Sequence, residues 1–269
     1  MISGSLLLVL GCCVYPAVRH RQSTARLVQA VINTDEVGVR AALADGADPN
    51  APPNYTSSLT LRDIPRLLFH RTPAPENGQT LVMFAAGNCD AGILQALLEA
   101  GGNVNSHDAN RTTSLMAAIA MGQHANVRLL VQHGANVNWS GKGQTPLMLA
   151  VHNAPDVEDF LFLLAHGADP NLCAQNTDTP LMFAAEVGST EGIRALLQAG
   201  AKVDTCNSCG ETALVSAAAN GKVKAVAQLL KAGADPTHRD QFGETAEDIA
   251  RNCRQAAAAK IVHDYSHSG

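Results

Sequence analysis

Aromatic side chains are scarce in this chain of 269 residues: they make up 4% of it, with a single tryptophan. Large single cores usually draw on phenylalanine, tyrosine and tryptophan for bulk. The composition therefore favours thin layers of closely approaching helices built from Leu, Ala, Val and Met. A basic excess is also absent, since the formal net charge is −5 and the pI is about 6.0. This balance argues against a nucleic-acid-binding module, which normally has a basic face.

Motifs that carry catalysis are missing as well. The sequence has no phosphate-cradling glycine loop, no metalloprotease histidine pair and no nucleophile elbow. The ten histidines are scattered, and the seven cysteines are an odd number without the spacing of a small disulfide scaffold. We therefore predict a protein that is not an enzyme and has no catalytic residue, cofactor or metal site, and we interpret most cysteines as reduced.

What the chain does have is an internal repeat. Threonines that open short apolar blocks recur at spacings of 33, 32, 34, 33 and 33 residues: Thr80, Thr113, Thr145, Thr179, Thr212 and Thr245. After most of these blocks comes a second apolar pattern that ends in glycine, as in residues 97–101 and 196–200. Threonine caps a helix N-terminus, proline suits the first helical position, and glycine ends a helix in the left-handed conformation. Each period therefore predicts two short helices and a turn.

This pattern resembles the ankyrin repeat, which opens on threonine-proline-leucine, continues through two antiparallel helices and ends in a Gly-Ala-Asp hairpin link. The resemblance covers roughly residues 24–265. It implies an all-α ankyrin-repeat solenoid of about seven helix-turn-helix repeats, capping repeats included, linked by β-hairpin loops. We accordingly divide the chain into a hydrophobic N-terminal segment, residues 1–22, and an ankyrin repeat domain, residues 23–269.

Two segments depart from the period. Residues 51–77 form a proline-rich insertion, which is either a finger over one edge of the binding surface or a linker packed loosely on the first repeats. In the fourth repeat, residues 153–159 contain one residue more than their siblings and lack the usual glycine. Helix capping by Asp156, with acids in the first turn, accounts for this second irregularity without invoking a function.

The N-terminal segment, residues 1–22, is a possible anchor or signal. Its apolar stretch, residues 6–18, is shorter than the roughly 20 residues that span a bilayer, whereas counting from the first residue gives eighteen. It lacks the basic start of a secretory signal. We favour membrane attachment, with Arg19, Arg21 and Arg26 holding the repeats on the cytoplasmic side. The alternatives to membrane attachment are that the segment is cleaved or exported, that the protein is cytoplasmic, and that the segment is a helix packed on the first repeat.

Cys206 and Cys209 form the one motif that suggests chemistry. Redox dithiols with this spacing begin a helix after a strand, whereas this pair lies between two repeats. A zinc site needs two further ligands. Cys173, at the equivalent position one repeat earlier, is expected on the order of 10 Å away, as packed helices are. A redox or metal-linked module, or a regulatory subunit of an enzyme, is our alternative to a binding scaffold.

The ankyrin resemblance also implies where a partner protein binds: on a concave groove made by hairpin tips and the exposed starts of the first helices. At these positions lie Asn110, Met121, Trp139, Lys142, His152, Asn153, Asn176, Asp178, Glu186, Val187, Glu211, Asn220, Phe242 and Glu244, with Ser208 and Cys209 also at a tip. Large aromatics are scarce and tryptophan is enriched in binding hot spots, so Trp139 and Phe242 are possible anchors, although Trp139 is as well explained by packing over the next hairpin.

Four of these positions carry acidic residues, which make the C-terminal half of the predicted groove negatively charged: Asp178, Glu186, Glu211 and Glu244. Opposite charges attract across an interface, so this half predicts a partner with a basic or mixed surface. We expect a monomeric protein-interaction scaffold that binds no nucleic acid.

Overall fold

The computed structural model of the chain describes residues 19–53, 78–141, 143–152, 157–173 and 177–267. The chain divides into two compact units, residues 1–135 and 136–269. In the first unit, residues 19–32 are helical, and they are followed by α2 (Glu36–Ala44), α4 (Leu81–Asn88), α5 (Ala91–Glu99), α6 (Ser114–Ala120) and α7 (His124–Gln132). The second unit contains α8 (Pro146–His152), α9 (Glu158–Ala165), α10 (Pro180–Val187), α11 (Thr190–Gln198), α12 (Ala213–Ala219), α13 (Val223–Lys231), α14 (Ala246–Asn252) and α15 (Ala256–Ser266). The predicted all-α class is confirmed.

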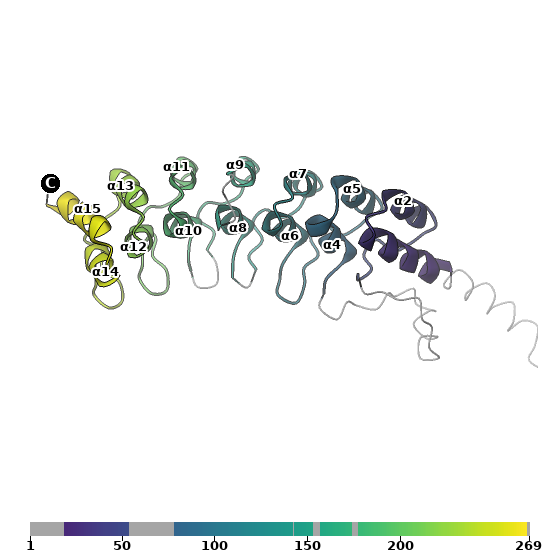
Figure 1. Cartoon of the computed structure of the whole chain (residues 1–269), viewed down its shortest axis with the longest axis horizontal. Helices are drawn as coiled ribbons and strands as arrows, with labels where there is room; N and C mark the ends of the chain where they lie inside the picture. The colour runs from purple at the N-terminus through teal and green to yellow at the C-terminus, as the bar shows by residue number, and fades with distance from the viewer. Residues whose placement is uncertain (1–18, 54–77, 142, 153–156, 174–176, 268–269) are drawn as a thin grey trace, which may run out of the picture. The chain divides into compact units, whose positions relative to one another are not determined.

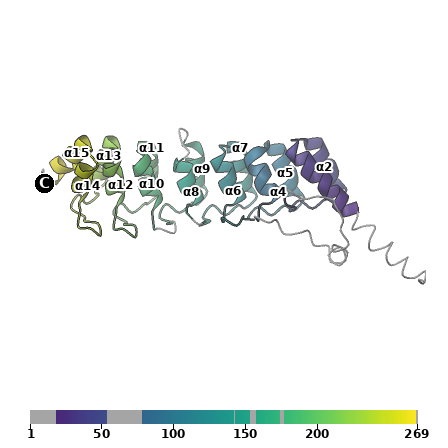
Figure 2. The same ribbon diagram turned by 60° about the horizontal axis from the view of Figure 1, so that its bottom comes forward.

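Each unit is built of two layers of helices. In the second unit, α10 packs between α8 and α12, and α12 packs on α14, while α13 packs on both α11 and α15. First and second helices of one repeat also pack on each other, as α12 does on α13. The first unit repeats the scheme, with α4 on α6 and α5 on α7. In the second unit the loops that lead into α12 and α14 project from the first-helix layer, away from the second helices (Figures 1 and 2).

The core is made almost entirely of aliphatic side chains, as the composition predicts. Buried residues in both units are mainly Ala, Leu, Val, Ile and Met, and among the described residues Phe160 is the aromatic one in the core. First helices that pack on each other carry fully buried alanines, such as Ala184 and Ala185 in α10 and Ala217 and Ala218 in α12. Small side chains let the helices approach closely, which explains how the chain stacks without large aromatics.

Most threonine caps follow the predicted signals. The predicted cap of α9 does not, because Asp156 lies outside the described residues and the N-cap of α9 is Val157, which makes no side-chain capping bond. The hydroxyl of Thr179 accepts a hydrogen bond from the N–H of Met182 at 3.3 Å, and the same bond is made at Thr80, Thr113, Thr145 and Thr245. The predicted capping role is therefore confirmed at these positions. Thr212 also occupies the N-cap position of α12, but its side chain makes no capping bond. Gly200 and Gly233 end their helices with φ of 90° and 91°, the left-handed conformation that glycine adopts without strain.

Asparagine side chains tie the loops of consecutive repeats together. Nδ2 of Asn171 donates to the carbonyl oxygen of Gly200 at 3.0 Å, and its Oδ1 accepts from the N–H of Lys202 at 2.9 Å. Equivalent pairs of bonds join Asn138 to Gly167 and Asp169, and Asn50 to Gly101 and Asn103. Asp204 holds this position one repeat later and accepts from the N–H of Asp235 at 3.0 Å. A carboxylate has no N–H to donate, so the second bond is missing from this link.

The predicted hairpin loops contain single antiparallel bridges, between His107 and Thr113 and between Arg239 and Thr245. Most of the predicted insertion, residues 54–77, lies outside the described residues, as do residues 1–18 and 153–156. The described chain on either side of the insertion is joined by a hydrogen bond from the N–H of Leu81 to the carbonyl oxygen of Ala51 at 2.9 Å. Within the described ranges, no helix is both long and apolar enough to cross a membrane.

Candidate functional site

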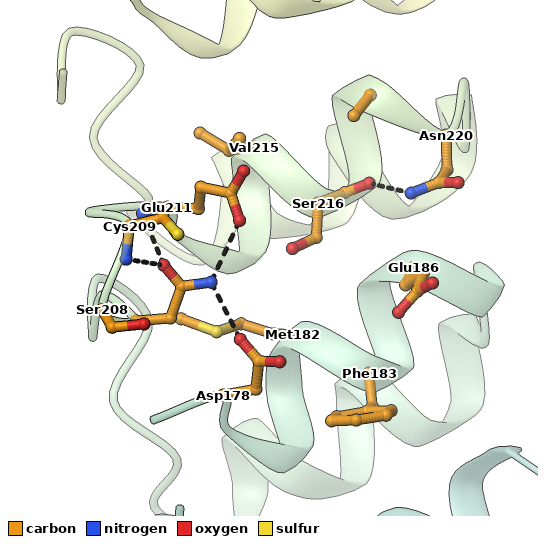
Figure 3. Close-up of a pocket in the computed structure, with 12 residues that line it drawn as sticks. Asp178, Met182, Phe183, Glu186, Ser208, Cys209, Glu211, Val215, Ser216 and Asn220 are labelled. Carbon is orange, nitrogen blue, oxygen red and sulfur yellow. Dashed lines mark hydrogen bonds between the residues drawn. The ribbon is translucent and has the colours of Figure 1, made fainter. Parts of the chain in front are cut away.

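A pocket of about 350 Å³ opens in the second unit, between α10, α12 and the loop that leads into α12 (Figure 3). We call it the α10–α12 pocket. Its walls come from two consecutive repeats: Asp178, Met182, Phe183, Glu186, Asn207, Ser208, Cys209, Glu211, Val215, Ser216, Ala219 and Asn220.

The pocket is acidic at both ends. Asp178 and Glu211 each precede a helix-opening threonine by one residue, so the repeat brings both carboxyl groups to the same level, which we call the loop end. Glu186 lies in the last turn of α10. Because an α-helix rises 1.5 Å per residue, Glu186 is roughly 9 Å along the helix axis from the first residue of α10, which Asp178 precedes by two residues. None of the lining residues is basic, so the charge inside the pocket has one sign.

Asn207 joins the two carboxylates of the loop end. Its Nδ2 donates to Oδ1 of Asp178 at 2.8 Å and to Oε2 of Glu211 at 3.0 Å (Figure 3). Its Oδ1 accepts from the backbone N–H groups of Cys209 and Glu211 at 2.9 and 3.0 Å, which shapes the loop around it. An asparagine amide has two N–H donors, and here both are engaged. The side chain therefore holds the two acids toward one point.

Sibling loops show which of these bonds the loop itself needs. Asp108 and Asp240 occupy the equivalent position, five residues before the helix-opening threonine. Their Oδ1 atoms accept from two backbone N–H groups each, at 2.8–2.9 Å, from Asn110 and Thr112 and from Phe242 and Glu244 respectively. An acceptor is thus sufficient to shape the loop. The Nδ2 donor is an addition at Asn207, and it is used on the two acids.

Between its acidic ends the pocket has apolar and aromatic walls. Met182 and Val215 are buried, and Phe183 is half-buried, so part of its surface is open to the pocket. At the far rim, Nδ2 of Asn220 donates to the carbonyl oxygen of Ser216 at 2.9 Å. A long side chain with an apolar stem and a charged head matches this arrangement.

Four of the predicted contact residues come together in this pocket: Asp178, Glu186, Glu211 and Asn220, accompanied by Ser208 and Cys209. That they bind a partner stays a prediction. Sequence reasoning missed Asn207. The signal was available, because an amide stands there where two sibling loops have a carboxylate, and acids precede the threonine in this repeat and in the previous one.

Four further predicted residues of the second unit that the structure describes lie outside the pocket. Val187 ends α10 without lining it. Phe242, on the following loop, has 76% of its surface exposed. Glu244 accepts from Nδ2 of Asn252 at 2.8 Å. Trp139 is half-buried, and its backbone N–H donates to the carbonyl oxygen of Asn136 at 3.4 Å.

Other predicted contacts belong to the first unit or are not described. Asn110 is exposed on the loop before α6, and Met121, 60% exposed, caps the end of α6. Lys142, Asn153 and Asn176 lie outside the described residues, as does the side chain of His152 at the end of α8. These positions remain predictions.

The cysteine pair lies on the loop that carries Asn207. Cys206 is exposed, Cys209 is half-buried, and both are free thiols. In the part of the chain that the structure describes, no group of three or more His, Cys, Asp or Glu side chains is arranged to hold a metal ion. The redox or metal-linked alternative stays a prediction.

A protein-family model described as Ankyrin repeats (3 copies) matches residues 63–141, 82–172 and 147–240, which together make up more than half of the chain. All residues that line the α10–α12 pocket fall within the third match. A comparison with curated proteins gave no match.

Proposed function

Because the chain belongs to the ankyrin repeat family, whose repeats generally mediate protein–protein interaction, we propose that it is a scaffold that binds a segment of another protein across the α10–α12 pocket. Proteins of this kind are usually not enzymes. The bound segment is basic or mixed in charge, and it lies on the face formed by the first helices and the loops that precede them.

One observation carries this proposal. Carboxylates from two consecutive repeats, Asp178, Glu186 and Glu211, line a single pocket that has no basic side chain in its walls. A cleft lined by one sign of charge raises the local concentration of the opposite charge and steers it in. Phe242, mostly exposed on the next loop, offers an apolar contact beside that charge, and large aromatic side chains dominate interface energetics.

Selection of random peptides on the full-length protein tests the proposal. Peptides selected from a displayed library should be enriched in arginine and lysine. Their affinity, measured by fluorescence anisotropy, should fall about tenfold in the variant Glu186→Lys/Glu211→Lys, since each solvent-exposed ion pair contributes about 0.2–1 kcal/mol and reversal replaces attraction by repulsion. Binding should also weaken as salt rises, because exposed charges are screened.

The matched control is Glu36→Lys/Glu99→Lys, which changes the net charge equally at two exposed glutamates of the first unit. This variant should bind the selected peptides like the unmodified protein. Selected peptides without a basic excess, or an equal loss of affinity in both variants, would overturn the proposal.

We further propose that the apolar N-terminal segment, residues 1–18, attaches this scaffold to a membrane, on the strength of its sequence alone. The full-length protein should then sediment with membranes from the expressing cells, and the variant Leu7→Asp/Val9→Asp should stay in the supernatant. Recovery of both proteins in the supernatant would contradict this attachment.

A further inference from the structure

We infer that the loop end of the α10–α12 pocket binds one arginine side chain of the partner, in preference to lysine; this inference rests on the protein-binding function proposed above. At about 350 Å³, the pocket lies at the lower end of the range for small-ligand sites. Such a volume suits one long side chain of a bound segment. The choice of side chain follows from Asp178, Glu211 and the ring of Phe183.

The spacing of the two carboxylates fits a guanidinium. Their hydrogen-bonded oxygens lie 2.8 and 3.0 Å from the same Nδ2 atom of Asn207. The two N–H bonds of an amide diverge by about 120°, so these oxygens are roughly 5 Å apart. A guanidinium presents five N–H donors in a planar fork and can donate to two carboxylates at once. An ammonium is a compact and strongly hydrated point charge, which gains less from two separated acceptors.

Phe183 supplies the second reason for arginine. It is the fourth residue of α10, and its half-buried ring forms part of the pocket wall (Figure 3). A guanidinium that reaches the loop-end acids can stack its flat face on such a ring, whereas an ammonium cannot stack. Glu186, in the last turn of α10 at the other end of the pocket, is assigned to a neighbouring part of the bound segment.

Asn207 is a positioning residue for this site. It touches the two acids from the loop side and directs both toward the pocket, while the sibling aspartates show that the loop forms without an amide. Removing the amide should therefore reduce the preference for arginine over lysine more than it reduces the binding of cations in general.

The test uses three small probes on the full-length protein: Nα-acetyl-arginine methylamide, its lysine counterpart and its citrulline counterpart, which has the shape of arginine without the charge. Titrations followed by ¹H–¹⁵N NMR should shift the side-chain amide of Asn207 and the backbone amide of Glu211. The arginine probe should saturate these shifts at about two- to fivefold lower concentration than the lysine probe, as expected for one exposed cation–π contact. Citrulline should produce no saturable shift.

Phe183→Leu should lower the arginine-to-lysine ratio, because it removes the ring and leaves the two carboxylates in place. Leucine is tolerated at this repeat position, since Leu149 occupies it in α8. The matched control is Phe84→Leu, the same change at the equivalent position of α4, which should leave the preference intact. Asn207→Asp keeps the Oδ1 acceptor that shapes the loop and removes the two donors to the acids, so it should lower the arginine-to-lysine ratio. A loss of folding would instead abolish the binding of both probes.

Equal affinity for arginine and lysine would overturn the arginine inference and leave the proposed binding of basic segments standing. Saturable binding of the citrulline probe, or NMR shifts at residues away from the pocket, would also overturn the arginine inference. A library selection without a basic excess would overturn the proposed function itself, and the two failures are therefore distinguishable.

Discussion

Replacing Asn207 by aspartate separates the role of its Oδ1 acceptor, which shapes the loop, from the role of its Nδ2 donors, which bind Asp178 and Glu211. The change keeps the Oδ1 acceptor that shapes the loop, as Asp108 and Asp240 do in sibling loops. It removes the two hydrogen bonds donated to Asp178 and Glu211 and places a third carboxylate against them. Each lost hydrogen bond costs about 0.5–1.5 kcal/mol. Repulsion between charges about 4 Å apart in watery surroundings adds about 1 kcal/mol. We expect the second unit to lose about 3 kcal/mol of unfolding free energy.

Urea denaturation followed by circular dichroism measures this loss. With an m-value of about 3 kcal/mol per M, the midpoint of the second unit should fall by about 1 M at pH 7. Two neighbouring carboxylates raise the folded-state pKa of the carboxyl introduced at position 207 above its unfolded value. Its destabilisation is therefore fully present above that folded pKa and is relieved as the pH falls toward the unfolded pKa near 4. The difference between the Asn207→Asp variant and the unmodified protein should shrink over that range.

The variant that carries both Asn207→Asp and Asp178→Asn completes the cycle. The amide introduced at position 178 can donate to the carboxylate at position 207, and the number of negative charges returns to that of the unmodified protein. Residues in direct contact show such coupling energies, so the double variant should recover most of the lost stability. An unchanged midpoint in Asn207→Asp, or a double variant no more stable than the single one, would refute the role assigned to Asn207.

Asp204→Asn should raise the urea midpoint of the second unit by an amount equal to about 0.5–1 kcal/mol, because the new amide can donate to the carbonyl oxygen of Gly233 as its counterpart does one repeat earlier; an unchanged midpoint would contradict this. Asn126→Ala should lower the free energy of unfolding of the first unit by about 2–4 kcal/mol, measured by thermal unfolding. The 1%-exposed side chain of Asn126 donates to two main-chain carbonyl oxygens at the end of α4. A smaller loss would show that water replaces the amide of Asn126. Hydrogen bonds from the backbone N–H and the hydroxyl of Thr245 hold the pKa of Asp248 below its usual value. The stabilisation from Asp248 is therefore complete above the unfolded pKa near 4 and is lost as the pH falls through the lower folded pKa, so the cost of Asp248→Ala should shrink between pH 7 and pH 3, and a constant cost would refute this assignment.

The candidate site was only partly readable from the sequence. Asp178 and Glu211 occupy the same repeat position, so the period alone places them on one face of the stack. Residue position within a repeat does not say how far apart two side chains are, however. Asn110 and Met121 were assigned to the same binding surface, yet they lie in the first unit and do not line the pocket.

The sequence by itself determined the helix pairs, their ends and the aliphatic core, because these depend on interactions within a few residues. A threonine cap reaches three residues ahead, as from Thr179 to Met182, and a left-handed glycine acts on its own turn. Only the tertiary structure decided what the pocket contains. The hydrogen bond from Asn207 to Asp178 joins residues 29 apart, and it exists only when two repeats stack at helix-packing distance. Stacking turned a loop residue into the link between two acids.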